Sequence, residues 1–297
     1  MVSYSIKDLE NLSGVKAHTL RVWEKRYQII QPSRTESNIR YYKEEDLQKI
    51  LNITILNRNG FKISAIVNMT DAEIKSKVGR FSHVESCYDD HLDCLMLATF
   101  ELDETKFNII LEHQISSHGF EKTIIDVLIP LLKKISLMLN SGSVNMVHQR
   151  FVHSIIKRKT AAQTDKIQKS DVCKKSKCLI YSCQESGNEI KLLFLNYIMN
   201  LHNYQVLNCG FVSSVEEVLL AKDLFNPSLI CTCFDTNQAS PFLTENVIKL
   251  ANTETSSKLF CISNHEYVDE SLYPPNVSFI HDLKQVSISL ASLCSRL

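Results

Sequence analysis

The sequence of 297 residues lacks several patterns that identify common classes of protein. It has no apolar run near the ~18 residues that a membrane span requires. Residues 1–5 lack the charged and then apolar pattern of a signal peptide. No glycine-rich dinucleotide motif, phosphate-binding loop or nucleophile elbow is present. We therefore expect a cytoplasmic protein that is not an enzyme and does not bind a membrane.

Paired metal ligands are also missing. The ten cysteines are scattered, with close pairs at Cys173/Cys178 and Cys231/Cys233. Neither pair has a second pair of ligands at zinc-like spacing nearby, so we expect these residues to act as small hydrophobic side chains and predict no metal. Four histidines invite a metal interpretation, but their spacing favours solvated or helix-capping roles: His113, His118, His148 and His153.

The net charge is zero, but the charges are unevenly distributed. Residues 1–80 carry +5, residues 81–156 carry −5, residues 157–177 carry +6 and residues 178–297 carry −6. A basic head followed by acidic parts is typical of a DNA-binding module with appended regulatory domains. The second basic stretch is polar and weakly periodic, so a solvated helix end with a linker is favoured over a second DNA contact.

The head has the pattern of a helix-turn-helix. Ser5 followed by Asp8 predicts the cap of a short first helix. Gly14 predicts a tight turn with positive φ, and a second helix follows over about residues 16–27. Two short helices joined by such a turn predict that the second enters the major groove of double-stranded DNA.

A two-stranded wing is expected next, around residues 33–42, and an amphipathic helix over about residues 46–56 follows it. Arginine side chains on the wing would reach phosphates, and tyrosine hydroxyls would add contacts. The residues that we predict to contact DNA are Lys16, His18, Thr19, Arg21, Trp23, Arg26, Arg34, Arg40, Tyr41 and Tyr42.

These residues resemble a known family. The segments 19–27 (TLRVWEKRY), 32–34 (PSR), 39–42 (IRYY), 46–47 (DL) and 60–63 (GFKI) are similar to the MerR family of transcription regulators. The LRxWExRY form resembles the subgroup that carries a cobalamin-binding domain behind the head. The resemblance implies a dimer on a palindromic operator, with half-sites about one helical turn apart.

The sequence departs from the family at the start of the second helix, where Lys16 replaces the frequent Ser or Thr cap. The loss of such a cap costs about 1 kcal/mol, although a lysine at this position can contact phosphate instead.

The middle of the chain reads as four helices, which predict a four-helix bundle because their connections are short. Pro130 lies inside the third helix and is expected to kink it. The four ranges are about 84–101, 103–117, 120–140 and 144–164.

Strands and helices alternate in the last part of the chain. This alternation predicts a parallel sheet with helices on both faces in a doubly wound, Rossmann-like (flavodoxin-like) order. The expected strands are 178–183, 205–209, 229–234, 259–262 and 277–279, and the expected helices are 188–202, 215–225, 241–252 and 283–297.

The fold class that we predict is therefore multidomain, with α and α/β parts. A MerR-type winged helix-turn-helix domain spans residues 1–78. A four-helix bundle that resembles a cobalamin cap spans residues 81–165. A cobalamin-binding-like α/β domain spans residues 176–297.

The last domain resembles that of the light-responsive repressors, in which a histidine after the first strand ligates cobalt and a glycine follows three residues later. These positions fall on Asn188 and Lys191. An amide is a poor ligand for a transition metal, and a lysine crowds a place where glycine allows close approach. The family's Trp and Glu-His positions in the bundle fall on Leu139 and on Gln149 and Arg150. We therefore expect no cofactor, cobalamin binding having been lost.

The sequence as a whole favours a DNA-binding transcription regulator with a sensor-like domain. The resemblance implies a bacterial protein on the nucleoid, in a homodimer or homotetramer, with RNA polymerase or another regulator as a further partner. A cobalamin-binding light or ligand sensor with non-standard ligation and an antirepressor-like interaction protein remain as alternatives. A corrinoid-dependent enzyme is disfavoured by the missing histidine.

Overall fold

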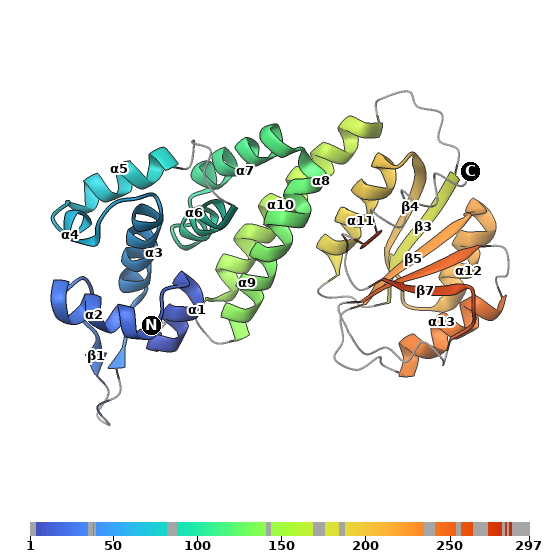
Figure 1. The fold of residues 1–297 in the computed structure, drawn as a ribbon. Coiled ribbons are helices and arrows are strands. Elements are labelled where there is room, and N and C mark those ends of the chain that lie inside the picture. Colours follow the sequence, from blue (N-terminus) through green and yellow to red (C-terminus); the bar gives the residue numbers. More distant parts are fainter. Residues whose placement is uncertain are drawn as a thin grey trace. The chain divides into compact units, whose positions relative to one another are not determined.

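The computed structural model forms two compact units, residues 1–155 and 156–297 (Figure 1). No helix in the described part of the chain is long and apolar enough to cross a membrane. The three predicted domain boundaries stay a prediction. The residues that the structure describes are 4–34, 38, 40–81, 88–140, 144–168, 176–183, 188–234, 241–253, 257–263, 273–280, 283 and 285–286.

The head consists of short helices and a two-stranded hairpin, as its sequence predicts. Its elements are α1 (Ile6–Ser13), α2 (Ala17–Tyr27), β1 (Ser33–Arg34), β2 (Arg40–Tyr41), α3 (Glu44–Arg58), α4 (Ile63–Ile66) and α5 (Asp71–Phe81).

The turn between α1 and α2 depends on a glycine. Gly14 has φ +70°, a left-handed conformation that favours glycine, as predicted. A Cβ at this position would lie 2.9 Å from Nη2 of Arg58, at the end of α3. That same Nη2 donates to the carbonyl of Ser13 at 3.1 Å. Gly14 is therefore required both by its backbone angle and by the close approach of Arg58.

Helix α3 is buried around most of its circumference. The sequence predicts an amphipathic helix, yet every residue from Ile50 to Leu56 is buried, including Asn52 and Thr54. The buried hydroxyl of Thr54 has a hydrogen-bond partner, because it donates to the carbonyl of Ile50 at 2.8 Å. This helix packs against α1 and α5 of the head and also against α6 of the bundle, so several of its faces lose contact with water.

A buried carboxylate joins the head to the bundle. Asp93 in α6 is 3% exposed. Its Oδ2 accepts from Nη1 of Arg58 at 2.8 Å, and its Oδ1 accepts from Nζ of Lys134 at 3.2 Å. Two cations thus compensate one buried anion, which is the condition under which a buried charge is tolerated. Arg58 consequently contacts both the α1–α2 turn and the bundle.

The middle of the chain is helical, as predicted. The rings of Phe107 and Phe151 meet edge to face, with centroids 6.0 Å apart, and join the second and last of these helices. The helical segments are α6 (Tyr88–Phe100), α7 (Glu104–His118), α8 (Phe120–Thr123), η1 (Ile124–Leu128), α9 (Ile129–Asn140) and α10 (Met146–Gln168).

The irregularity expected at Pro130 takes the form of a wider turn. Residues Ile124–Leu128 form a π-helical segment, in which the N–H of Ile129 donates to the carbonyl of Ile124. Pro130 has no N–H to donate, and its ring crowds the preceding turn, so the helix widens just before it. The predicted third helix is therefore three consecutive helical segments.

One of the four histidines caps α10. The side chain of Asn145 accepts from the N–H groups of Val147 (2.9 Å) and His148 (3.3 Å), and Nδ1 of His148 accepts from the N–H of Asn145 at 3.4 Å. This reciprocal arrangement confirms the predicted capping role for His148, although the side chain is buried rather than solvated.

The second unit contains a five-stranded parallel sheet in the order β4-β3-β5-β6-β7. This is the doubly wound order that the alternation predicts, and its switch point lies between the adjacent strands β3 and β5. Most of the predicted last helix, 283–297, lies outside the described residues. The strands are β3 (Ser176–Ser182), β4 (Tyr204–Phe211), β5 (Leu229–Phe234), β6 (Lys258–Ser263) and β7 (Val277–Ile280).

Helices cover both faces of this sheet (Figure 1). On one face, Val215 and Val218 of α12 (Val215–Phe225) and Leu250 of α13 (Pro241–Thr253) pack against Leu179 and Ile230 of the central strands. Helix α11 (Glu189–Leu201) lies on the other face and contacts β3 and β4. The strands are consequently buried on both sides, which explains their continuous apolar runs.

The glycine turn generates a testable prediction about stability. Gly14→Ala should lower the free energy of unfolding by about 2–3 kcal/mol. About 1 to 2 kcal/mol comes from the left-handed backbone, and the remainder from displacing Arg58 from the carbonyl of Ser13. Urea denaturation followed by circular dichroism measures this loss.

Gly60→Ala is the matched control, because Gly60 also has positive φ (+89°) but nothing lies within 4 Å of its added Cβ. We expect this variant to lose only the backbone part. Equal losses in the two variants would show that Arg58 moves aside without cost.

Candidate nucleic-acid interface

The start of α2 is fixed by a carboxylate from α1. Lys16 makes no side-chain cap, as predicted. Instead, Oε2 of Glu10 accepts from the N–H of Ala17 at 3.1 Å, and Nζ of Lys16 lies 3.2 Å from Glu10 Oε1. The hydrogen bond from Ala17 and then that from Lys16 hold the pKa of Glu10 below its ordinary value. The missing cap is thus replaced from the preceding helix, and the exposed Lys16 remains at the front of α2.

One face of α2 is buried and the opposite face is open. Leu20 and Trp23 are 0% and 6% exposed and form the inner face. Thr19 is half-buried at the border between the two faces. The side chains exposed on the outer face are His18, Arg21, Val22, Lys25 and Arg26.

The hairpin is joined to the head at its base. Ser33 pairs with Tyr41 and Arg34 pairs with Arg40 in an antiparallel register. Beyond the second strand, the backbone of Tyr42 exchanges two hydrogen bonds of 2.8 Å with that of Tyr4. Figure 1 shows the hairpin projecting from the head next to α2. Arg34 and Arg40 are exposed, and Tyr41 is half-buried.

Glu24 ties the second helix to the hairpin. Its Oε1 accepts from Nε of Arg40 at 3.4 Å, and its Oε2 accepts from the Tyr42 hydroxyl at 3.4 Å. Burial, and next the charge of Glu24, raise the pKa of Tyr42 to about 12. The phenol therefore stays protonated at neutral pH and serves as a donor to Glu24. This carboxylate sets the position of the wing relative to α2.

Two predicted DNA contacts are wrong on grounds of burial. Trp23 is 6% exposed and Tyr42 is completely buried, so neither side chain is available to a duplex. Trp23 packs in the core of the head, and Tyr42 hydrogen-bonds to Glu24. Their places in the sequence motif reflect the packing of the head rather than recognition.

Sequence reasoning missed Val22. This side chain is 50% exposed on the outer face of α2, next to Arg21. The sequence did indicate its exposure, because this apolar residue falls outside the i, i+3 stripe of Leu20 and Trp23. An exposed aliphatic group on such a helix can contact a thymine methyl. Arg26, by contrast, lies over the ring of Tyr27, with its Cζ 5.4 Å from the centroid.

The predicted cofactor position of the second unit lies at the carboxyl ends of the central strands. Asn188, directly before α11, is 1% exposed. Its Nδ2 donates to Oγ of Ser182 at the end of β3 and to the carbonyl of Cys233 in β5, both at 3.2 Å. The Asn188 amide thereby joins the ends of two strands. Lys191, in the first turn of α11, is half-buried.

The matching positions in the helical bundle differ in exposure. Leu139 in α9 and Gln149 in α10 are half-buried, and Arg150 is exposed. An apolar side chain, an amide and a guanidinium therefore stand at these three positions.

The head matches a known protein family. Residues 4–73 match the family described as MerR HTH family regulatory protein. The chain is 22% identical over 162 residues to the HTH-type transcriptional repressor CarH of Myxococcus xanthus, which covers 52% of this chain and 54% of CarH. It is 30% identical over 66 residues to the HTH-type transcriptional regulator MlrA of Escherichia coli (strain K12), covering 22% and 27% of the two chains. The chain therefore matches about half or less of the length of these relatives.

A solved structure also shares the fold. The Methanosarcina barkeri monomethylamine corrinoid protein is 10% identical and superposes with a TM-score of 0.53, covering 69% of this chain and 100% of its own. At this identity the likeness concerns the fold alone. The chain thus carries a helix-turn-helix domain of the MerR regulatory family at its N-terminus and shares the fold of a corrinoid protein over much of its length.

Proposed function

We propose that this protein is a transcription regulator that binds an operator in double-stranded DNA as a dimer or higher oligomer. The observation that carries the proposal is the outer face of α2, whose exposed cations stand beside a hairpin with two exposed arginines. The match of residues 4–73 to the MerR family supports the same function.

Recognition would be divided between the two elements. Helix α2 enters the major groove, where Arg21 donates to a guanine edge and Val22 contacts a thymine methyl. His18 and Thr19 lie on the same helix and add polar contacts. Other contacts would hold the duplex by its phosphates and carry no sequence information. We assign these phosphate contacts to Lys16, Arg26, Arg34, Arg40 and Tyr41.

The oligomeric state, the further partner and the place of action also belong to this proposal. A palindromic operator requires two heads, so the protein would act as a homodimer or homotetramer. The further partner would be RNA polymerase or another regulator at the same promoter. Its place of action is the cytoplasm, where the DNA lies.

We further propose that the α/β domain has lost cobalamin binding. Cobalt would need a neutral imidazole as a ligand, and the chain offers the amide of Asn188 at that position. This amide already donates to Ser182 and to the carbonyl of Cys233, so its position serves the edge of the sheet. Lys191, which is half-buried in the first turn of α11, stands where the family has a glycine, and its long side chain would crowd an approaching cofactor. These residues do not fit the cofactor, and we derive no chemistry from it.

The DNA proposal predicts the effect of removing two cations. Arg21→Ala combined with Arg40→Ala should weaken binding to an operator about 100-fold, at about 1.4 kcal/mol for each lost contact. The operator is obtained by repeated selection from a random duplex library with the wild-type protein. Gel shifts at several salt concentrations measure the affinity, and the salt slope of Arg40→Ala alone should fall by about 1.

The charge-matched control is Lys122→Ala with Lys133→Ala, which removes two exposed positive charges from the bundle. This variant should bind the operator as the wild type does. Retained binding in the arginine variant would overturn the DNA proposal and would favour an antirepressor-like protein that acts by binding another regulator.

The cofactor proposal predicts an absence that can be measured. After incubation with adenosylcobalamin in the dark and gel filtration, the protein should elute without the corrinoid absorption bands. A known corrinoid protein, treated in parallel, provides the positive control. A stoichiometric corrinoid spectrum in the wild type that disappears in Asn188→Ala would show non-standard ligation by this amide and overturn the proposal.

A further inference from the structure

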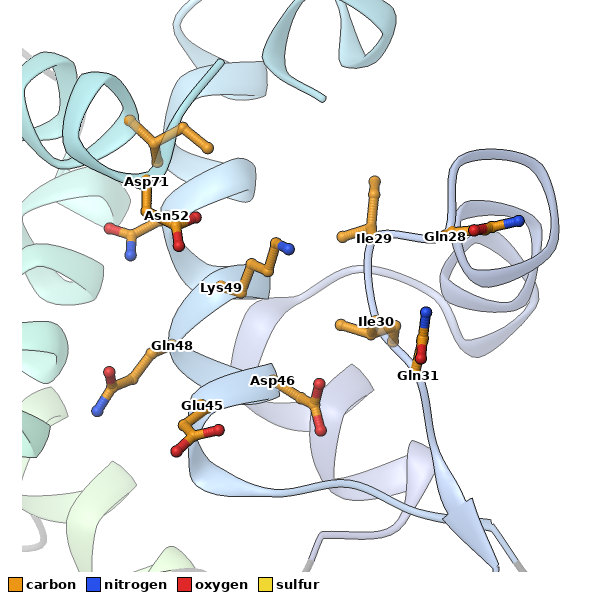
Figure 2. Close-up of a pocket in the computed structure, with 11 residues that line it drawn as sticks. Gln28, Ile29, Ile30, Gln31, Glu45, Asp46, Gln48, Lys49, Asn52 and Asp71 are labelled. Carbon is orange, nitrogen blue, oxygen red and sulfur yellow. The ribbon is translucent and has the colours of Figure 1, made fainter. Parts of the chain in front are cut away.

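A cavity of about 470 Å³ lies in the head, away from the outer face of α2. It is open to solvent on one side and is bordered by three elements: the segment 28–31 that follows α2, the first half of α3, and the start of α5 (Figure 2). A second cavity of about 240 Å³ shares part of the same lining. The volume lies in the range of small-molecule sites, and neither the DNA contacts nor the cofactor position uses it.

Part of the wall is apolar. Ile29, Ile30 and Ile74 line the cavity and are 4%, 2% and 5% exposed. These side chains come from the 28–31 segment and from α5. Such a wall accommodates an aliphatic or aromatic group of a ligand.

A buried amide also lines the cavity. Asn52 is 8% exposed, and its side chain makes no hydrogen bond with any residue that the structure describes. Its neighbours on α3, Ile53 and Thr54, are buried as well, but Thr54 has a hydrogen bond of its own. The Asn52 amide is thus available to hydrogen-bond with a polar group of a ligand in the cavity.

Charges of opposite sign stand around the same space. Lys49 extends from α3 toward the segment that holds Ile29, and Asp71 begins α5 (Figure 2). Within the described residues, neither side chain forms an ion pair. Glu45, one turn before Lys49, also lines the cavity and is likewise unpaired there. The cavity thus presents a cation, carboxylates and a buried amide beside an apolar wall.

We propose that this cavity binds a free α-amino acid with an apolar side chain. The ligand's carboxylate would pair with Lys49 and its ammonium group with Asp71, while Asn52 would hydrogen-bond to either. Its side chain would lie on Ile29 and Ile74. A zwitterion can pair with Lys49 and Asp71 at once, whereas a simple amine would leave Lys49 unpaired and a simple acid would leave Asp71 unpaired. Glu45 and Asp46 also line the cavity, but Asp46 already accepts from the N–H of Lys43 at 2.9 Å.

The site would regulate the head, and this part of the inference rests on the proposed function. The 28–31 segment connects the C-terminus of α2 to strand β1 of the wing. Gln28 ends α2 in a left-handed conformation with φ 52°. A ligand held between this segment and α3 would fix α2 relative to the wing, and therefore change the affinity for DNA.

The test is calorimetric titration of the full-length protein, without DNA, with each of the twenty L-amino acids. We expect at least one apolar amino acid to bind. If this is leucine, 3-methylbutylamine, which lacks the carboxylate, and 4-methylpentanoate, which lacks the amine, should each bind at least tenfold more weakly. Lys49→Met and Asp71→Asn should each weaken the binding of the amino acid at least tenfold.

Lys62→Met is the matched control, because Lys62 is an exposed lysine in the same head that does not line the cavity. It should bind as the wild type does. Circular dichroism checks that each variant is folded, and Lys49 and Asp71 are both exposed, so their replacement leaves the core intact.

Three outcomes would overturn the proposal: no amino acid binds, binding survives in both Lys49→Met and Asp71→Asn, or the amine alone binds as tightly as the amino acid. Because this titration contains no DNA, its failure is separate from a failure of operator binding. Gel shifts with and without the bound amino acid then measure regulation, and we expect a change in affinity of at least fivefold.

Discussion

The burial of α3 is the constraint on which the first unit depends. This helix contacts the head on one side and the bundle on the other, so its residues from Ile50 to Leu56 are all withdrawn from water. At its end, the guanidinium of Arg58 reaches the carbonyl of Ser13 in the helix-turn-helix and the carboxylate of Asp93 in the bundle. Gly14 leaves the room that this guanidinium needs. The side chain of Arg58 therefore contacts both the turn that precedes α2 and the helix bundle.

Two glutamates hold the cations of the surface that we propose to face DNA. Glu10 caps the start of α2 and holds Lys16, and Glu24 holds Arg40 and Tyr42 of the hairpin. Both place a negative charge behind exposed cations, which orients those cations and limits the number of conformations to be lost on binding. The proposed amino-acid cavity lies behind the same helix, at the segment that leads to the wing. Its occupation would act on an arrangement that these glutamates already define.

The α/β unit has a doubly wound sheet, and a side chain near its switch point forms hydrogen bonds within that sheet. Asn188 links the ends of β3 and β5 through its amide. Leu179 and Ile230 form an apolar cluster with residues of the helices that cover them. If cobalamin binding is lost, as we propose, the fold can remain, because the fold depends on buried strands and cobalt ligation on a ligand atom at one position.

The sequence alone determined the elements and their order. Ser5 with Asp8, Gly14 and the alternating apolar strands act through neighbouring residues, so the caps, the turn and the parallel sheet were predictable. Only the tertiary structure decided which residues of the motif are buried and which are exposed: Trp23 and Tyr42 proved buried, and Val22 proved exposed. It also decided that α3 is buried on several faces, and that Glu10 replaces the cap missing at Lys16. The physical reason is that burial and ion pairing depend on partners distant in sequence, such as Asp93 for Arg58, whereas periodicity reports only a helix's own faces.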